Sequence, residues 1–563
     1  MKNWVLICLG AIVYFAASFT STYAQITPMS APPHEKREPY TQTTIYQWSV
    51  PLEGKDKESR AFLWVPPNCK QVRGLIFANQ VILEDLFCAN KQIREACTKE
   101  SLGIVLVFRG PFTQFNYKEG GNTFAQIQKV LDDLAAVSGY TEVAAAPLLT
   151  IGHSGGANGA YSIAYCKPQR VFGILTLHAA AMVNPPDYDP KARIEGIPVM
   201  AVSGEYESWA NPLEPLDKHW RWLRGDLLDL RAKYNHSLVC EVVQPGAGHF
   251  NFDDKLAKLC AMFVQKAAHY RIPAENSSPN NPVALNTLDE TKGWLTDIHI
   301  MDNNRFRPIA YKDFKGDNTL AFWHIDEEMA KAMDAFPALY GGKKEQRVCF
   351  MQNDKPVPAS WINELAFQPS ADGITFGVKA GYLTQTPEGV AGSGIPLSHS
   401  NKGKIKFSLI GGWGGGGEQV SVDSFRIHFD HFGTSRFCSN IQVMAYKDGD
   451  ETYKYAEQPA QIKFPEKNTQ GEPQTINFPE ITAISSLTKE IKLNATSSAG
   501  LPVYYYVKDG PASVKGNVIT LDSLPVKANY PIKIAVVAWQ WGRGIAPLMQ
   551  TANPVERVIL ITK

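Results

Sequence analysis

The feature that most constrains this sequence is the stretch 147–165, PLLTIGHSGGANGAYSIAY. A short apolar run, which predicts a buried strand, ends at Gly152-His153-Ser154-Gly155-Gly156, and an alanine-rich segment with helical character follows. Gly152 and Gly156 lack the side chains that would collide where a strand turns sharply into a helix. The stretch therefore predicts a strand, a tight turn that carries Ser154, and a helix.

This arrangement resembles the G-x-S-x-G nucleophile elbow of the α/β-hydrolase family, in which the serine occupies a strained turn between a strand and a helix. The resemblance extends over residues 43–273. It implies a doubly wound, mostly parallel sheet of the α/β class, and it makes Ser154 the candidate nucleophile.

Apolar runs separated by helical patterns support that fold. Because these runs are nearly continuous in Val, Ile and Leu, they predict parallel strands buried on both faces of a sheet. Predicted strands cover residues 43–50, 60–65, 74–78, 103–108, 148–152, 171–177, 197–203 and 238–243, and predicted helices cover 90–99, 123–137 and 252–269. A doubly wound sheet binds its ligand at the carboxyl ends of its strands, where Ser154 is expected.

A serine hydroxyl is a poor nucleophile at neutral pH, so it needs a base and a group that orients the base. The resemblance implies the chain order serine, acid, histidine. It assigns the base to His249, in a glycine-rich loop between the last predicted strand and helix, whereas His178 ends another strand and receives no role. The acid, commonly the third residue after a glycine at this strand end, is Glu207, with Glu205 as the alternative.

Acyl transfer also needs backbone N–H groups that stabilise the developing oxyanion. The resemblance implies Gly155 as one donor and the loop after residue 78 as the source of the other. We expect Gln80 in that role, with Val81 as the alternative. No cofactor and no metal are expected.

Composition excludes some classes of partner. The chain has 563 residues, 44% of them hydrophobic, which predicts several packed domains, and 56 basic against 55 acidic residues give no electrostatic case for nucleic acid. Residues 1–24 have a positive start, an apolar centre and a small-residue cleavage site, the pattern of a signal peptide. We expect a periplasmic or secreted monomer without a membrane span after cleavage.

Eight cysteines follow the predicted signal peptide, without a CxxC pair or clustering with histidines, so a zinc site has no support. Disulfides are allowed in an exported protein, and Cys88 and Cys97 are the closest pair in sequence. The apolar surroundings of Cys166, Cys240 and Cys260 predict buried thiols.

The region around the predicted site suggests an open cleft. Residues 178–196, where family members insert a cap domain, are too few for one. Aromatic side chains that could stack on sugar rings follow several strands: Phe112, Phe115, Tyr117, Tyr188, Trp209, Trp220 and Trp222. For Trp220 and Trp222, which lie in an amphipathic helical pattern, a place in the core is an equally good interpretation.

Beyond a Pro- and Asn-rich linker at 273–286, short alternating runs predict β-rich accessory domains, with one helix at 326–336. The expected domains are a signal peptide at 1–24, a catalytic domain at 40–273, a β-rich domain at 288–465 and a β-sandwich at 473–563. The last segment resembles bacterial immunoglobulin-like domains through runs such as 476–479, 493–497 and 500–503. The glycine run 411–417 lacks the Lys-Ser/Thr ending of a phosphate loop.

The sequence thus predicts a secreted serine hydrolase that cleaves carboxylic esters, with acyl or methyl esters of polysaccharides as the favoured substrates and a small ester as a further partner. The alternatives are a catalytically inactive glycan-binding or adhesive protein, an exported peptidase and a polyester depolymerase. Because every predicted catalytic residue precedes Pro273, activity on a small ester is expected to survive truncation there.

Overall fold

The computed structural model describes residues 46–53, 58–110, 120–185, 190–207, 218–234, 236–274, 281–299, 304–338, 342–388, 392–410, 417–433 and 440–563. The predicted signal peptide, most of the glycine run 411–417 and Cys438 lie outside these residues. So do Phe112, Phe115, Tyr117, Tyr188, Trp209 and the side chains of Trp220 and Trp222. The roles predicted for them stay predictions.

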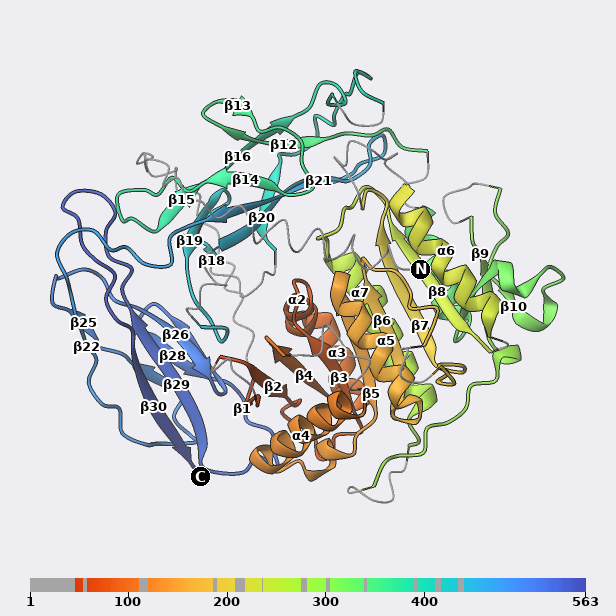
Figure 1. The fold of residues 1–563 in the computed structure, drawn as a ribbon, viewed down its shortest axis with the longest axis horizontal. Coiled ribbons are helices and arrows are strands. Elements are labelled where there is room, and N and C mark those ends of the chain that lie inside the picture. The colour runs from red at the N-terminus through yellow and green to blue at the C-terminus, as the bar shows by residue number, and fades with distance from the viewer. Residues whose placement is uncertain are drawn as a thin grey trace.

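An eight-stranded sheet with the order β1-β2-β4-β3-β5-β6-β7-β8 forms the centre of the first half of the chain (Figure 1). β2 is antiparallel to β1 and β4, and every other pair is parallel, which confirms the predicted sheet. The strands are Trp48–Pro51 (β1), Arg60–Trp64 (β2), Gly74–Asn79 (β3), Leu102–Phe108 (β4), Leu148–His153 (β5), Val171–Leu177 (β6), Pro198–Gly204 (β7) and Leu238–Gln244 (β8).

Helices cover both faces of this sheet, and the buried side chains form one cluster on each face. Ile76 of β3 belongs to one cluster and its neighbours Leu75 and Phe77 to the other, as the alternation of a strand requires. α2 (Glu84–Ala89), α3 (Lys91–Glu100) and α7 (Asp254–Arg271) lie on the first face, and α4 (Gly120–Ser138), α5 (Ala157–Cys166) and α6 (Lys218–Lys233) on the second. All residues of β3 to β8 are therefore buried.

The second half of the chain is β-rich, as predicted, and its strands form seven smaller sheets among the described residues. Its first part has the helix α8 (Glu327–Ala338) and the strands Trp294–Asp297 (β9), Ile309–Ala310 (β10), Ala321–His324 (β11), Val348–Gln352 (β12), Lys355–Pro356 (β13), Asn363–Ala366 (β14), Thr375–Gly377 (β15), Lys379–Tyr382 (β16), Lys406–Leu409 (β17), Gly417–Gln419 (β18), Ser424–Ile427 (β19), Asn440–Lys447 (β20) and Ala456–Lys463 (β21).

The last part, residues 473–563, contributes two larger sheets with the orders β23-β30-β29-β26 and β24-β28-β27, and the pair β22-β25. Its strands are Ile476–Asn477 (β22), Ile484–Ser485 (β23), Glu490–Lys492 (β24), Thr496–Ser497 (β25), Tyr504–Asp509 (β26), Ala512–Lys515 (β27), Val518–Leu521 (β28), Ile532–Trp539 (β29) and Val555–Thr562 (β30). Most of their inward side chains form a third hydrophobic cluster of their own.

The core cluster on the α3/α7 face extends into the β-rich half. It runs from Phe62 and Phe263 through Phe322 and Phe350 to Trp541. Polar contacts accompany this packing, since Lys266 of α7 lies 2.5 Å from Asp326. The later strands therefore cover apolar surface of the large sheet, instead of being joined to it only through a linker.

Three further observations concern disulfides, membrane spans and metal sites. The seven cysteines that the structure describes are all free thiols, including Cys88 and Cys97. Within the described ranges, no helix is long and apolar enough to cross a membrane, and no group of three or more His, Cys, Asp or Glu side chains could hold a metal ion.

Truncation tests the shared core. Because a chain ending at Pro273 would expose the α3/α7 face, we expect it to aggregate or to melt at a lower temperature than the full chain. A protease site inserted between residues 274 and 281 supplies the matched control, since cleavage there leaves both halves in place. Size-exclusion chromatography should show the cleaved halves eluting together, whereas separate, folded halves would contradict the shared core.

Candidate active site

Ser154 lies at a sharp turn between β5 and α5. Its backbone has φ +51°, a left-handed conformation that costs a non-glycine residue energy and is typical of a nucleophile elbow. A Cβ at Gly152 would lie 2.3 Å from the carbonyl group of Gly156, and one at Gly156 would lie 2.8 Å from Glu84 Oε1. Backbone atoms leave room only for glycine at position 152, whereas a larger residue at position 156 would displace the carboxylate of Glu84.

His249 and Glu207 come from neighbouring loops at the carboxyl ends of β8 and β7. The Nδ1 atom of His249 lies 2.7 Å from Glu207 Oε2, and both side chains are buried. Because a carboxylate only accepts, Nδ1 carries the proton, and the proton-accepting nitrogen is Nε2. Nε2 has no hydrogen-bond partner among the described residues, so it is available to a neighbouring hydroxyl group.

Ser154 is partly exposed at this edge of the sheet, where parallel strands present their carboxyl ends. The structure records no hydrogen bond from its hydroxyl group to His249, and such bonds are often absent before substrate binds. His153, the residue before Ser154, connects the elbow to the loop that carries His249, because its Nε2 atom lies 2.9 Å from the carbonyl oxygen of His249. Since that carbonyl accepts, His153 carries its proton on Nε2. Burial, with the neighbouring histidines, holds the pKa of His153 well below its usual value.

Glu207 has a second histidine partner that the sequence analysis left without a role. His178, at the end of β6, places Nδ1 2.5 Å from Glu207 Oε1, and the Gly204 N–H donates to the same oxygen at 2.5 Å. Burial raises the pKa of Glu207, but His178 and His249 outweigh burial and hold its pKa well below the usual value. The position of His178 was the available signal, because β6 lies beside β7 and both strands end at the same edge.

Glu205, the alternative acid, faces a different partner. Its Oε1 atom accepts from Lys454 at 2.6 Å and its Oε2 atom from the Gly246 N–H at 2.8 Å. The structure therefore brings Glu207, and not Glu205, into contact with His249.

The expected oxyanion donors differ in their surroundings. Gly155 is exposed, with no atom within 4 Å of where its Cβ would stand. The Gln80 N–H, however, donates to Val107 O at 2.8 Å, and the Val81 N–H donates to Glu84 Oε2 at 2.8 Å. Both amides already donate within the protein, which argues against Gln80, and against its alternative Val81, as the second donor. We keep only Gly155 in this role.

Glu84 is a second buried carboxyl group that the sequence analysis overlooked. It accepts from the N–H groups of Val81, Ile82 and His153, so it ties the loop after β3 to the elbow. Burial raises the pKa of Glu84 to about 7 in spite of these donors. Its contacts give it a positioning role at the base of the elbow.

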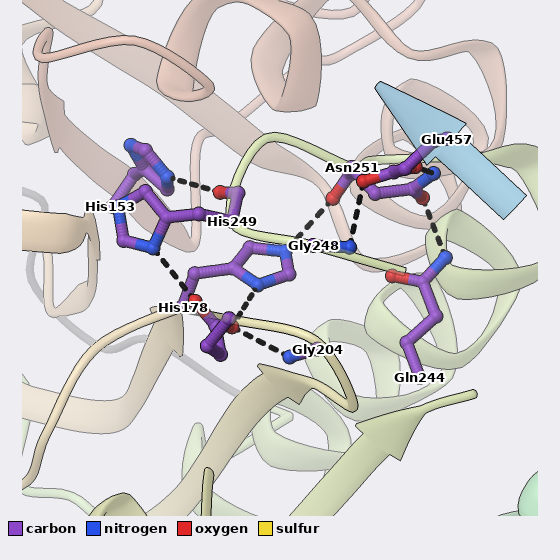
Figure 2. A network of polar contacts seen from close by, with 9 residues as sticks. His153, His178, Gly204, Gln244, Gly248, His249, Asn251 and Glu457 are labelled. Atoms are coloured by element: carbon purple, nitrogen blue, oxygen red, sulfur yellow. Dashed lines mark hydrogen bonds and ion pairs between the residues drawn. The ribbon is translucent and has the colours of Figure 1, made fainter. Parts of the chain in front are cut away.

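The β-rich half of the chain reaches this site through Glu457 of β21. Figure 2 shows Glu457 beside the loop that carries His249, where it accepts from the Gly248 N–H at 2.7 Å and from Asn251 Nδ2 at 2.5 Å. The Asn251 amide also donates to Tyr455, at 2.9 Å. The accessory region thus holds the histidine loop in place.

Trp361, just before β14, is the second contact from that region. Its ring centre lies 5.1 Å from that of His249 and 5.0 Å from that of Phe250, and 43% of the residue is exposed. A partly exposed tryptophan ring therefore packs beside the candidate base. The predicted triad lies before Pro273, but Glu457 and Trp361, which contact the His249 loop, lie after it.

Comparison with known proteins finds solved structures of low similarity and no matching sequence family. No family model matches the sequence, and no curated protein matches it. Among solved structures, a Bacillus cereus carboxylesterase is 14% identical and covers 37% of this chain and 94% of its own, with a TM-score of 0.26. A dienelactone hydrolase from Anabaena variabilis is 14% identical and covers 41% of this chain and 100% of its own, with a TM-score of 0.29.

A poly(3-hydroxybutyrate) depolymerase from Bordetella parapertussis is also 14% identical, covers 41% of this chain and 92% of its own, and has a TM-score of 0.30. The large sheet has the α/β-hydrolase fold. This statement rests on the strand order, the parallel pairing and the elbow described above.

Substitution of the two loop carboxylates tests the choice of acid. Glu207→Gln should lower kcat by about 10³- to 10⁴-fold, because a neutral amide no longer holds the Nδ1–H tautomer of His249. Glu205→Gln is the matched control and should leave kcat nearly unchanged, since its partners are Lys454 and Gly246. Steady-state kinetics on p-nitrophenyl acetate give the comparison, and a larger loss in Glu205→Gln would transfer the role to Glu205.

Proposed function

We propose that this protein is a serine hydrolase that cleaves carboxylic esters, with Ser154 as nucleophile, His249 as base and Glu207 as the acid that orients the base. The observation that carries the proposal is the free Nε2 atom of His249, on a ring whose Nδ1 proton is held by Glu207, in the loop next to an elbow serine. These are the groups that acyl transfer requires.

In this proposal, the hydroxyl proton of Ser154 passes to His249 Nε2 as the oxygen attacks the ester carbonyl carbon. The Gly155 N–H donates to the oxyanion, and Glu207 stabilises the imidazolium that forms. His249 then returns the proton to the leaving alcohol, which departs and leaves an acyl group on Ser154. Water, deprotonated by the same nitrogen, attacks the acyl carbon, and the acid and free serine are released.

For the substrate, we propose an acyl or methyl ester carried by a polysaccharide. Trp361 supports this class, because an exposed indole plane next to the base can stack on the apolar face of a sugar ring. The predicted signal peptide, the short segment at 178–196 and the accessory β-rich regions also favour a polymeric, extracellular substrate.

Hydrolysis of p-nitrophenyl acetate tests the reaction class. The purified chain should turn this ester over, and Ser154→Ala should reduce the rate to the uncatalysed background while circular dichroism stays unchanged. Equal rates in both proteins would remove Ser154 from the reaction. No hydrolysis of any tested ester by a folded wild-type chain would favour the inactive glycan-binding alternative.

Substitution of Trp361 tests the substrate class. Trp361→Ala should lower kcat/KM on an acetylated or methyl-esterified plant polysaccharide about two- to tenfold, the effect of one lost stacking contact. Glyceryl triacetate, a small ester without a ring, should be hydrolysed at nearly the wild-type rate. Trp361→Phe keeps an aromatic plane and serves as the control. Equal losses on both substrates would mean that Trp361 supports His249 and does not bind sugar.

A further inference from the structure

His178 is a buried titratable group beside the proposed triad that the proposed mechanism does not use. It is 1% exposed, and both of its ring nitrogens face oxygen atoms. Nδ1 lies 2.5 Å from Glu207 Oε1, and Nε2 lies 2.9 Å from the backbone carbonyl oxygen of Asn251. Figure 2 shows the His178 ring between the histidine loop and the acid loop.

The two partners of His178 determine its protonation. A carbonyl oxygen has no proton to donate, so Nε2 must carry one. Glu207 Oε1 already accepts from the Gly204 N–H, and Oε2 accepts from His249, which favours the ionised carboxylate over a protonated one. Nδ1 must therefore donate as well. A neutral His178 ring would turn a nitrogen lone pair toward either Glu207 Oε1 or the carbonyl oxygen of Asn251.

Asn251 holds the second acceptor firmly. Its side-chain amide donates to Tyr455 and Glu457, and its Oδ1 atom accepts from Gln244 at 2.5 Å. The carbonyl oxygen that faces His178 thus belongs to a residue fixed from three sides. The accessory region contributes two of these contacts, through β21 and the residue before it.

We propose that His178 is a positively charged positioning residue, an imidazolium that fixes Glu207 in place and offsets the negative charge that Glu207 presents to His249. This proposal rests on the proposed function, because it acts through the triad. His178 itself cannot serve as the base, because neither of its nitrogens has a free lone pair in this arrangement.

The charged groups around His178 support that protonation state. They are the carboxylates of Glu207 and Glu457 and the rings of His153 and His249, whose centres both lie 5.9 Å from that of His178. Burial lowers the pKa of His178, but Glu207, with a smaller effect from Glu457, outweighs burial and raises its pKa above the usual value. Burial, with the rings of His249 and His178, outweighs the opposite effect of Glu207 and holds the pKa of His153 low, so His153 adds no competing charge.

A charge on His178 has a consequence for the pH dependence of the reaction. His249 accepts the serine proton only when its Nε2 atom is unprotonated, so protonation at low pH stops the reaction. A positive ring 5.9 Å away opposes a second positive charge on His249. If His178 loses its charge, Glu207 presents a full negative charge to His249, and the acid limb of the pH profile moves to higher pH.

The test is the pH profile of kcat/KM in His178→Asn and His178→Leu. Asn keeps an N–H donor near the position of Nδ1 but no charge, and Leu keeps neither. In both variants the midpoint of the acid limb should rise by roughly one to two pH units, the effect of two unit charges about 6 Å apart at an effective dielectric constant of about 20. At the optimum, Asn should retain more kcat than Leu, because it still orients Glu207.

Controls separate this proposal from the proposed function. His236→Asn removes an exposed histidine whose nearest carboxylate is Glu290, and its profile should match that of the wild type. An acid limb that does not move in His178→Asn would overturn the charge on His178 while leaving the esterase activity established. If the wild type hydrolyses the ester no faster than Ser154→Ala does, the proposed function itself would be overturned.

A measurement on the charge itself does not depend on activity or on a folded His178 variant. ¹⁵N-histidine NMR at pH 7.5 should show a ring with two protected N–H protons in His431→Asn, a variant without a buried ring that lies beside Asp85 and Asp430. The buried ring of His249 also faces a carboxylate, but only its Nδ1 atom has a hydrogen-bond acceptor among the described residues. An ordinary histidine is about 90% neutral at this pH. If every buried ring were neutral in this spectrum, the proposal would be wrong.

Discussion

The candidate site depends on the hydrogen bonds that the buried Glu207 carboxylate accepts. One oxygen accepts from His249, the other from His178 and the Gly204 N–H, so a single buried group fixes two rings and one loop. Burying an unpaired carboxylate is costly, and these donors make its ionised form favourable at this place. The orientation of His249 thus depends on how Glu207 is held. Removal of either ring would leave the Glu207 carboxylate with one hydrogen bond fewer.

The β-rich half of the chain belongs to the same network. Glu457 of β21 holds Asn251 and the Gly248 N–H, Asn251 holds His178, and His178 holds Glu207. Trp361 adds a wall beside His249. Because these contacts combine with a continuous apolar core, the accessory region supports the site both mechanically and electrostatically.

Local signals predicted the large sheet, the elbow and the loops of Ser154, His249 and Glu207, because strand periodicity and glycine placement are written in short stretches of sequence. The contacts made at long range could not be predicted. β21 contains Pro459 in the middle of a four-stranded sheet and shows no apolar alternation, so the strand that carries Glu457 was missed. The place of Gln80 after β3 predicts an oxyanion donor, but its N–H donates to Val107 O, a contact that the local sequence does not indicate.

The central claim is that Ser154 is activated by a base held in one orientation. A fluorophosphonate probe tests it most directly, because the probe reacts only with an activated serine, and intact mass followed by peptide mapping counts and locates the adduct. We expect one adduct per chain, on Ser154, formed far more slowly in Glu207→Gln. Labelling of another serine, or equally fast labelling of Ser154 in Glu207→Gln, would contradict the account.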